Sequence, residues 1–518
     1  MRIGIDVGGT HTDAVLLDGD QLLAATKRPT TEDIQSGVLD GLNEVLRQSG
    51  VSPDTVQMVT IGTTQFTNAV VERSGLVPVA AVRVGKQSSS AMPIAAKWPA
   101  DIKAAALHSA HMIDGGSEFD GRPIVPTDFE ALAAAMPTLS KAETVAISAV
   151  FGTADPTAEE AVAAHIRESA GTALISCSHI FGQLGLHQRE NATILNSALL
   201  PLADKVATAF ETAFATIGLT CPLFISQNDG TLMTAEFARK FPVLTFSSGP
   251  TNSMRGATFL SGEANAMVVD IGGTTSDIGM LIDGFPRPSG SYVSVAGVRT
   301  NFRMPDVLAV GLGGGSFVSD DGATVGPKSL GHRLTTEGLV FGGSTMTATD
   351  IAVSAGRADI GDTAKTQAIP DQVRTTAMAE MRRLLEDHID QMKTSPEPLP
   401  LIVVGGGAFL APDALAGVSK VIRPENAGVA NAIGAAFAQV GGEAEAVYTQ
   451  SQRTRDEALA EAKAAAIRKA VVAGAEENST QIVTIDETPM SYVDEPGAVI
   501  RVKAIGDVDL DRLQGASA

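Results

Sequence analysis

The chain has 518 residues, with 38 Lys and Arg against 59 Asp and Glu, so its formal net charge is −21 at pH 7. Hydrophobic residues make up 44% of it and charged residues 19%, which is the composition of a globular protein and excludes a disordered or fibrous one. The acidity argues against nucleic acid as the main partner, because phosphate backbones are bound through an excess of Lys and Arg.

The apolar runs are short and the cysteines few. Runs such as Met267–Ile271 and Leu399–Val404 fall far below the roughly 20 residues that a membrane-spanning helix needs. Cys177 and Cys221 provide neither a disulfide framework nor a zinc-binding set. The chain enters a strand pattern at its start, without the features of a signal peptide. We therefore expect a protein of the reducing cytoplasm, with no membrane partner.

A motif near the N-terminus occurs a second time far along the chain. Residues 4–19 read GIDVGGTHTDAVLLDG, and residues 268–284 read VVDIGGTTSDIGMLIDG. In each copy an apolar run ends in an aspartate, Gly-Gly-Thr follows, and a second apolar run leads to an Asp-Gly turn. The pattern predicts two β-hairpins that belong to two related domains.

The two predicted turns are suited to phosphate. Glycine permits conformations in which backbone N–H groups point inward, and such a concavity binds anions. The carboxylates of Asp6 and Asp270 can each hold a magnesium ion or a water, so we predict them as catalytic and metal-binding residues. We expect the hairpins to grip a polyphosphate from both sides, through Gly8, Gly9, Thr10, His11 and Thr12 in the first and Gly272, Gly273, Thr274 and Thr275 in the second.

Three features leave alternatives open, two between the hairpins and one in the first of them. Arg189 and Glu190 stand before a stretch of helical character, where they form either a solvated ion pair or part of a cleft. Asn228-Asp229-Gly230 is a strong turn sequence. His11 is either a donor near phosphate or an exposed turn residue.

The last part of the chain holds a glycine run, a helix and a tail. Leu401–Val404 predicts a buried strand, and Gly405, Gly406 and Gly407 follow it, so that a ligand can approach the backbone closely. Residues 449–476 are rich in Ala, Glu, Lys and Arg and predict a helix. Residues 480–505 contain two β-rich runs and predict a small β-containing tail.

The order of hairpin, hairpin and strand-Gly-Gly-Gly resembles the actin, Hsp70 and sugar-kinase ATPase superfamily. Further segments resemble the A-type (ATPase) subunit of the hydantoinase/oxoprolinase family. They are IGTTQFTNAVVER at 61–73, RENATILNSA at 189–198, QNDG at 227–230, SGP at 248–250, VAG at 295–297, VGLGGGS at 310–316 and FGG at 341–343 with Thr349-Asp350.

The resemblance implies a fold and its domains. The fold class is α/β, with two RNase H-like, actin-like ATPase domains flanking a nucleotide cleft and a small α+β C-terminal extension. We expect an N-terminal hydantoinase/oxoprolinase domain over 1–185, a second RNase H-like domain with a helical insertion over 186–445, and a C-terminal helix with a β-containing tail over 446–518.

The resemblance also implies a chemistry. The expected activity is that of an enzyme, an ATP-dependent hydrolase that opens a cyclic amide such as a hydantoin or 5-oxoproline by phosphorylating its carbonyl oxygen, with ATP and Mg²⁺ as cofactors. It adds Asp229 as a catalytic candidate and Gly313 and Gly314 as cofactor-binding candidates. The alternatives are an ATP-using subunit of a carboxylase-type or kinase-like complex acting on another carbonyl compound, and a nucleotide-switched regulatory ATPase.

Two departures from the family pattern bear on that chemistry. Many relatives have a histidine where Leu308 stands here, and the shared pattern stops near Gly441, whereas full family subunits continue further. Both put standard hydantoin or oxoproline turnover in doubt and leave the ATP site untouched. We expect a small carbonyl substrate and a second, separately encoded subunit as partners, with a homo-oligomer possible.

Overall fold

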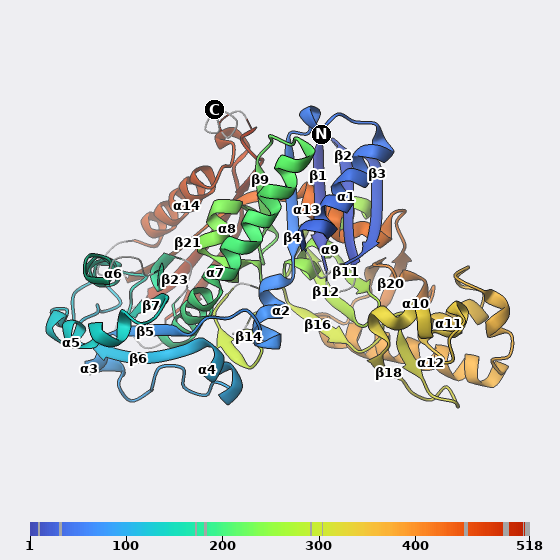
Figure 1. The fold of residues 1–518 in the computed structure, drawn as a ribbon, viewed down its shortest axis with the longest axis horizontal. Coiled ribbons are helices and arrows are strands. Elements are labelled where there is room, and N and C mark those ends of the chain that lie inside the picture. Colours follow the sequence, from blue (N-terminus) through green and yellow to red (C-terminus); the bar gives the residue numbers. More distant parts are fainter. Residues whose placement is uncertain are drawn as a thin grey trace.

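The computed structural model describes residues 1–8, 11–30, 34–170, 174–180, 184–290, 293–302, 304–449, 454–490, 497–510 and 512. Within these ranges the chain forms three larger sheets with helices packed around them (Figure 1). The second sheet, with its helices, lies on one side of the molecule and the third on the other. The predicted α/β class with two related units is confirmed.

The first sheet combines strands from both ends of the chain. Within the described residues it has nine strands, in the order β22-β23-β21-β10-β9-β4-β1-β2-β3. The predicted C-terminal strands β22 and β23 are present, and they extend this sheet through β21. The bounds are β1 Arg2–Val7, β2 His11–Asp18, β3 Gln21–Pro29, β4 Met58–Thr63, β9 Leu223–Ser226, β10 Thr231–Thr234, β21 Gln439–Thr449, β22 Gln481–Pro489 and β23 Gly497–Gly506.

The second sheet repeats the centre of the first. An antiparallel hairpin, β11-β12, pairs in parallel with β19, just as β1-β2 pairs in parallel with β4. In the described chain its order is β13-β12-β11-β19-β20, with β16 beside β12. The bounds are β11 Ala266–Ile271, β12 Ser276–Ile282, β13 Phe285–Pro286, β16 Val307–Val310, β19 Leu399–Val404 and β20 Val418–Ile422.

The third sheet is parallel and belongs to the N-terminal half. Among described residues its order is β6-β5-β7-β8. Its central strands are buried along their whole length, as a parallel sheet covered by helices requires. The bounds are β5 Val79–Val84, β6 Leu107–Ile113, β7 Thr144–Ala149 and β8 Leu174–Cys177; two small ribbons pair β14 Val293–Val295 with β15 Val298–Thr300 and β17 Ser316–Val318 with β18 Val325–Ser329.

The helices follow their apolar spacing. In α12, buried side chains recur every four residues, at Val373, Ala377, Met381, Leu385 and Ile389. The predicted C-terminal helix is α14, which begins after a Thr454–Glu457 capping box. The bounds are α1 Ile34–Ser49, α2 Gln65–Glu72, α3 Lys86–Ser89, α4 Ala100–Ala106, α5 Phe129–Leu139, α6 Thr157–Ala170, α7 Leu186–Ile217, α8 Ala235–Lys240, α9 Ser248–Ser261, α10 Leu334–Glu337, α11 Ala348–Ser354, α12 Asp371–Met392, α13 Ala430–Phe437 and α14 Arg455–Val472. None of those in the described chain has the length and apolar character that crossing a bilayer demands.

Two helices join the first sheet to the second. Helix α13 packs on β1 and β2, and α9 packs on β11 and β19. The two helices contact each other closely because glycines stand at their crossing. A Cβ atom on Gly256 would lie 1.8 Å from the carbonyl oxygen of Ala430, and one on Gly434 would lie 1.9 Å from that of Asn252. No larger residue is accommodated at either position without moving a helix.

Candidate active site

The two hairpins predicted from the repeat have the same geometry. Asp6 pairs with Asp13 across β1-β2, and Asp270 pairs with Asp277 across β11-β12. Each turn is closed by the same hydrogen bond, from Gly8 N to His11 O at 3.0 Å and from Gly272 N to Thr275 O at 2.9 Å. The predicted site residues Gly9 and Thr10 lie outside the described residues.

Helices α9 and α13 bring the two strand-end aspartates to a common site. Ser253 Oγ donates to the carboxylate of Asp270, and the preceding residue, Asn252, places its amide beside Asp6. Asn431 Nδ2, from α13, donates to Asp6 Oδ2 at 2.9 Å. Adjacent side chains of one helix thus face the two hairpins, so the structure brings Asp6 and Asp270 together.

The third predicted motif also meets this site. A Cβ atom on Gly405, which has a φ of +88°, would lie 2.2 Å from Asp270 Oδ1, so only glycine lets the chain pass the carboxylate. Gly407 N donates to Ile271 O at 2.7 Å. The strand-Gly-Gly-Gly element therefore packs against the second hairpin, and its binding of a nucleotide stays a prediction.

Lys27 belongs to the site although no sequence pattern marked it. Its ammonium group lies 2.6 Å from Asp13, whose side chain is 2% exposed, and it donates to Gly428 O at 3.2 Å. Its Cε lies 3.7 Å from the position of a Cβ on Gly406. Lys27 thus reaches from the first hairpin to the glycine run and places a positive charge where all three motifs meet.

Nearby positive charges and hydrogen bonds only partly stabilise the negative charge of the buried carboxylates in the site. Burial, and then the charge of Asp13, raise the pKa of Asp6 to about 6. Burial raises the pKa of Asp270, and burial with the charge of Asp270 raises that of Asp277 to about 7. Asp6 Oδ1 is buried and has no hydrogen-bond partner among the described residues. Mg²⁺ is bound by carboxylate oxygens, and its charge would offset the repulsion between these neighbouring carboxylates. The oxygen of Asp6 that lacks a hydrogen-bond partner is therefore a suitable ligand for this ion.

The remaining hairpin residues differ in what they contact. Gly273, Thr274 and Thr275 are exposed at the second turn. Thr12, by contrast, is buried, and its hydroxyl lies 3.3 Å from that of Thr30. Burial, and then the charge of Lys27, lower the pKa of His11.

The loop at Gly313 and Gly314 supports the second turn. Gly314 N donates to Gly272 O at 3.0 Å, and Gly315 N donates to Gly273 O at 2.7 Å. A Cβ on Gly313 would lie 2.6 Å from backbone atoms of Thr274. These contacts hold the hairpin turn in place, and direct cofactor binding by the loop stays a prediction.

Asp229 occupies a different environment. Its carboxylate lies 2.8 Å from Lys503 Nζ and accepts hydrogen bonds from Thr231. The nearby Lys503 and these hydrogen bonds outweigh burial and lower the pKa of Asp229. Asp229 is thus a charge-compensated turn residue in the loop between β9 and β10, and its catalytic role stays a prediction.

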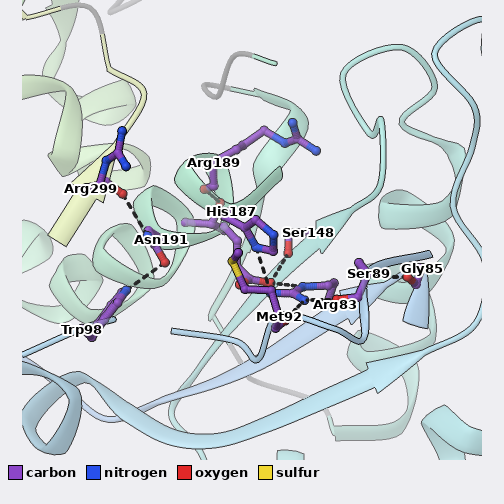
Figure 2. Close-up of polar contacts among 12 residues, drawn as sticks. Arg83, Gly85, Ser89, Met92, Trp98, Ser148, His187, Arg189, Asn191 and Arg299 are labelled. Carbon is purple, nitrogen blue, oxygen red and sulfur yellow. Dashed lines mark hydrogen bonds and ion pairs between the residues drawn. The ribbon is translucent and has the colours of Figure 1, made fainter. Parts of the chain in front are cut away.

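Arg189 and Glu190 lie in a buried polar network, which rules out the solvated ion pair. They are 1% and 2% exposed. Glu190 accepts from Arg83 Nε and Nη2, both at 2.6 Å, and from Ser148 Oγ at 3.2 Å (Figure 2). Trp98 Nε1 donates to the Asn191 side chain at 2.8 Å in the same view. The network connects α7 to strands β5 and β7 of the third sheet. All of its contacts are made within the protein, so we assign it a structural role.

Comparison with known proteins identifies the family. Residues 2–170 match the hydantoinase/oxoprolinase N-terminal region, and residues 189–372 match the hydantoinase/oxoprolinase region that follows it. The chain belongs to the hydantoinase/oxoprolinase family. The resemblance drawn from the sequence motifs is therefore confirmed.

Two curated relatives within this family have different chemistries. The chain is 27% identical over 378 residues to the caprolactamase subunit alpha of Pseudomonas jessenii, covering 68% of this chain and 54% of the relative. It is 25% identical over 390 residues to the acetophenone carboxylase gamma subunit of Aromatoleum aromaticum, covering 68% and 53%. The chain thus spans about half the length of the curated relatives it matches, both of which are subunits of larger enzymes.

Solved structures agree with the fold. The ATP-dependent caprolactamase from Pseudomonas jessenii matches with a TM-score of 0.71 at 19% identity, over 98% of this chain and 87% of that chain. Nucleotide-free acetone carboxylase matches with a TM-score of 0.68 at 18% identity, over 98% and 88%. At this identity the likeness establishes the fold of this family member and not its substrate.

Leu308, the residue at which we expected a departure from the family pattern, lies on β16. It pairs with Ile278 of β12 and packs against the core of the second sheet. The nearby Asp306 forms an ion pair with Arg287 at 2.7 Å. The Leu308 side chain therefore makes apolar contacts at this position. Strand β16, which reads VLAV over Val307–Val310, contains no titratable side chain.

Proposed function

We propose that this protein is an ATP-dependent hydrolase that opens a small cyclic amide by phosphorylation of the carbonyl oxygen. The observation that carries the proposal is the pairing of two equivalent hairpins, whose strand-end aspartates, Asp6 and Asp270, meet at adjacent residues of α9. The glycine run after β19 and Lys27 complete the set of groups around the two carboxylates.

Different residues of the site would bind the cation, orient the carboxylates and balance the phosphate charge. Asp6 and Asp270 would hold Mg²⁺, directly or through water. Asn431 donates a hydrogen bond to Asp6 and Ser253 donates one to Asp270, which fixes the orientation of the two carboxylates. When bound, ATP with Mg²⁺ would supply a phosphoryl group whose charge is partly neutralised. Lys27 places a positive charge beside the glycine run. Such positioning and charge compensation are the main contributions that a protein makes to phosphoryl transfer.

The chemistry also explains why ATP would be spent on a lactam. A lactam carbonyl carbon is a weak electrophile, and its ring nitrogen is a poor leaving group. Transfer of the γ-phosphoryl group to the carbonyl oxygen, with release of ADP, would make the carbon more electrophilic. Water would then add to that carbon, the ring C–N bond would break with the nitrogen leaving as a protonated amine, and hydrolysis of the resulting acyl phosphate would release phosphate. The caprolactamase relative, whose name describes the opening of such a ring, supports this substrate class.

A carboxylase-type function is the second candidate. The acetophenone carboxylase relative is almost as similar to the chain as the caprolactamase relative, at 25% against 27% identity. In this alternative the same site would activate a ketone for carboxylation, within a complex that contains further subunits.

ATP hydrolysis by the purified chain with Mg²⁺ distinguishes the candidates. Stimulation by hydantoin, 5-oxoproline or ε-caprolactam supports the hydrolase, and stimulation by a ketone that requires bicarbonate supports the carboxylase. Slow turnover that no small molecule stimulates supports a nucleotide-switched regulatory ATPase.

Asp270→Asn tests the site itself. We expect it to lower ATP turnover by about a hundredfold or more, the magnitude seen when a preorganised charge-stabilising group is removed. Asp283→Asn is the matched control, because Asp283 is exposed at the far end of the same hairpin and should leave turnover unchanged. Parental turnover by Asp270→Asn would refute the two-hairpin site.

A further inference from the structure

An open groove lies between α14 and α8. Its volume is about 770 Å³, which is room for a few side chains of another molecule. The buried side chains of Met233 and Phe302 line it, and Ala465 of α14 lines one wall. The residues around the groove are different from those of the two hairpins, so the chemistry proposed above makes no use of this space.

Large apolar side chains are exposed around this groove. Ile180 is 48% exposed, Phe237 of α8 is 38% exposed and Val472 of α14 is 77% exposed, and all three line the groove. Single apolar residues are common on protein surfaces, but apolar side chains that gather around one hollow mark an interaction site. A segment that filled the groove would remove these side chains from water, and that burial favours binding.

One side of α14 is presented to the groove. Its groove-lining residues are spaced as i, i+3, i+4 and i+7, so they lie along one side of the helix: Ala465, Arg468, Lys469 and Val472. The neighbouring side packs against the first sheet and consists of alanines, at Ala458, Ala462, Ala466 and Ala470. The long side chains on the groove-facing side are therefore left for contacts with another molecule.

The groove has an excess of positive charge. Arg468 and Lys469 are exposed, and neither forms an ion pair with any residue that the structure describes. The three carboxylates of the lining are already engaged: Asp229 lies 2.8 Å from Lys503, Glu445 lies 2.5 Å from Arg501, and Glu443 also has an interaction partner. The excess is local, because the whole chain carries a net charge of −21. Apolar walls beside two free cations are complementary to a segment that carries apolar side chains next to carboxylates.

A second copy of this chain fits the groove poorly. In a two-fold dimer the same surface of both protomers meets, so Arg468 and Lys469 would face their own counterparts. Like charges brought together in this way oppose association. The charge pattern therefore favours a different protein as the occupant.

We propose that the groove between α14 and α8 is a docking site for an acidic amphipathic helix of a partner protein. Apolar side chains of that helix fill the hollow beside Phe237 and Val472, and its carboxylates pair with Arg468 and Lys469. Laying the apolar face of a helix into a groove is a common mode of peptide recognition. This docking is independent of the reaction at the nucleotide site.

Fluorescence anisotropy of the full chain tests the proposal with two labelled helical peptides. One has a leucine face flanked by glutamates, and the other has lysines in place of the glutamates. We expect the acidic peptide to bind at least about tenfold more tightly than the basic one, and added salt to weaken its binding because exposed charges are screened. Failure of the acidic peptide to bind, or equal binding of the two peptides, would overturn the proposal.

Variants locate the binding. Val472→Asp should weaken binding of the acidic peptide by about tenfold or more, whereas Val71→Asp, at a 50% exposed position on α2, should not. Arg468→Glu combined with Lys469→Glu should reverse the preference between the peptides, and Lys463→Glu, elsewhere on α14, should leave it unchanged. Undiminished binding by Val472→Asp or by the double variant would overturn the assignment. So would a dimer of the parent chain in sedimentation that Val472→Asp dissociates, because a second copy would then cover the groove.

Discussion

The Arg83–Glu190 pair gives a sharp test of how the third sheet is held to α7. The two side chains are 0% and 3% exposed, and Arg83 also donates to the carbonyl oxygens of Ser89 and Met92. Arg83→Met would leave the Glu190 carboxylate buried without its cation. Removing one partner of a buried pair costs about 3–5 kcal/mol, so we expect the free energy of unfolding to fall by that amount.

Urea unfolding measures the free energy of unfolding of the parent chain, of the single variants Arg83→Met and Glu190→Leu, and of the double variant. Glu190→Leu added to Arg83→Met removes the stranded charge and should restore at least about 2 kcal/mol, because two apolar side chains often replace a buried ion pair at little cost. Arg383→Met is the control: Arg383 is 57% exposed on α12, and its loss should cost no more than about 0.5 kcal/mol. A loss below about 1 kcal/mol for Arg83→Met, or a double variant less stable than the single one, would refute the reasoning.

Two further predictions concern the joined sheets and the hairpin carboxylates. Gly434→Ala should lower the free energy of unfolding by about 3 kcal/mol or more, since its methyl group would meet the Asn252 carbonyl, whereas Gly428→Ala, with nothing within 4 Å, should be nearly neutral in the same urea assay. In magnesium-free buffer, Asp6→Asn should stabilise the protein by up to about 3 kcal/mol near pH 8 and by little near pH 4. The sign follows because a carboxyl pKa raised from 3.8 to about 6 penalises folding increasingly as pH rises between these values, and fully above them. A gain that persists near pH 4 would contradict the electrostatic explanation.

Local patterns in the sequence were sufficient to predict the hairpins. Asp6 and Asp270 could be placed because each follows an apolar strand and precedes glycines, and both features depend only on neighbouring residues. The strand before Gly405 was predictable for the same reason. Their meeting at one site was expected from the repeat, because two copies of a phosphate-suited hairpin predict that a polyphosphate is held from both sides.

The supporting side chains could not be predicted in this way. Asn252, Ser253 and Asn431 reach the aspartates only because α9 and α13 cross at glycines, which is a property of tertiary packing. Lys27 becomes part of the site through the pairing of β2 with β3, which places it opposite Asp13. No residue pattern within α9 distinguishes its hairpin-facing side from its other buried sides.

The long-range pairing of the C-terminal strands was also beyond local reasoning. Two β-rich runs predicted strands, but nothing near them shows that they pair with β21 and so complete a sheet begun by residues 2–29. These strands join the rest of the sheet through β21 and β10, whose paired residues Thr231 and Gln439 are 439 − 231 = 208 positions apart in the chain.

That sheet has a consequence for biosynthesis. During translation, β1-β2-β3 and β4 emerge hundreds of residues before β21 and β23. One edge of β10 therefore stays unpaired until β21 has been synthesised, when most of the chain has left the ribosome. Contacts of such high sequence separation slow folding and leave strand edges open to pairing with other chains. We therefore expect the nascent protein to depend on chaperones more than its well-packed native state suggests, and its last strands to act as the closing step of folding.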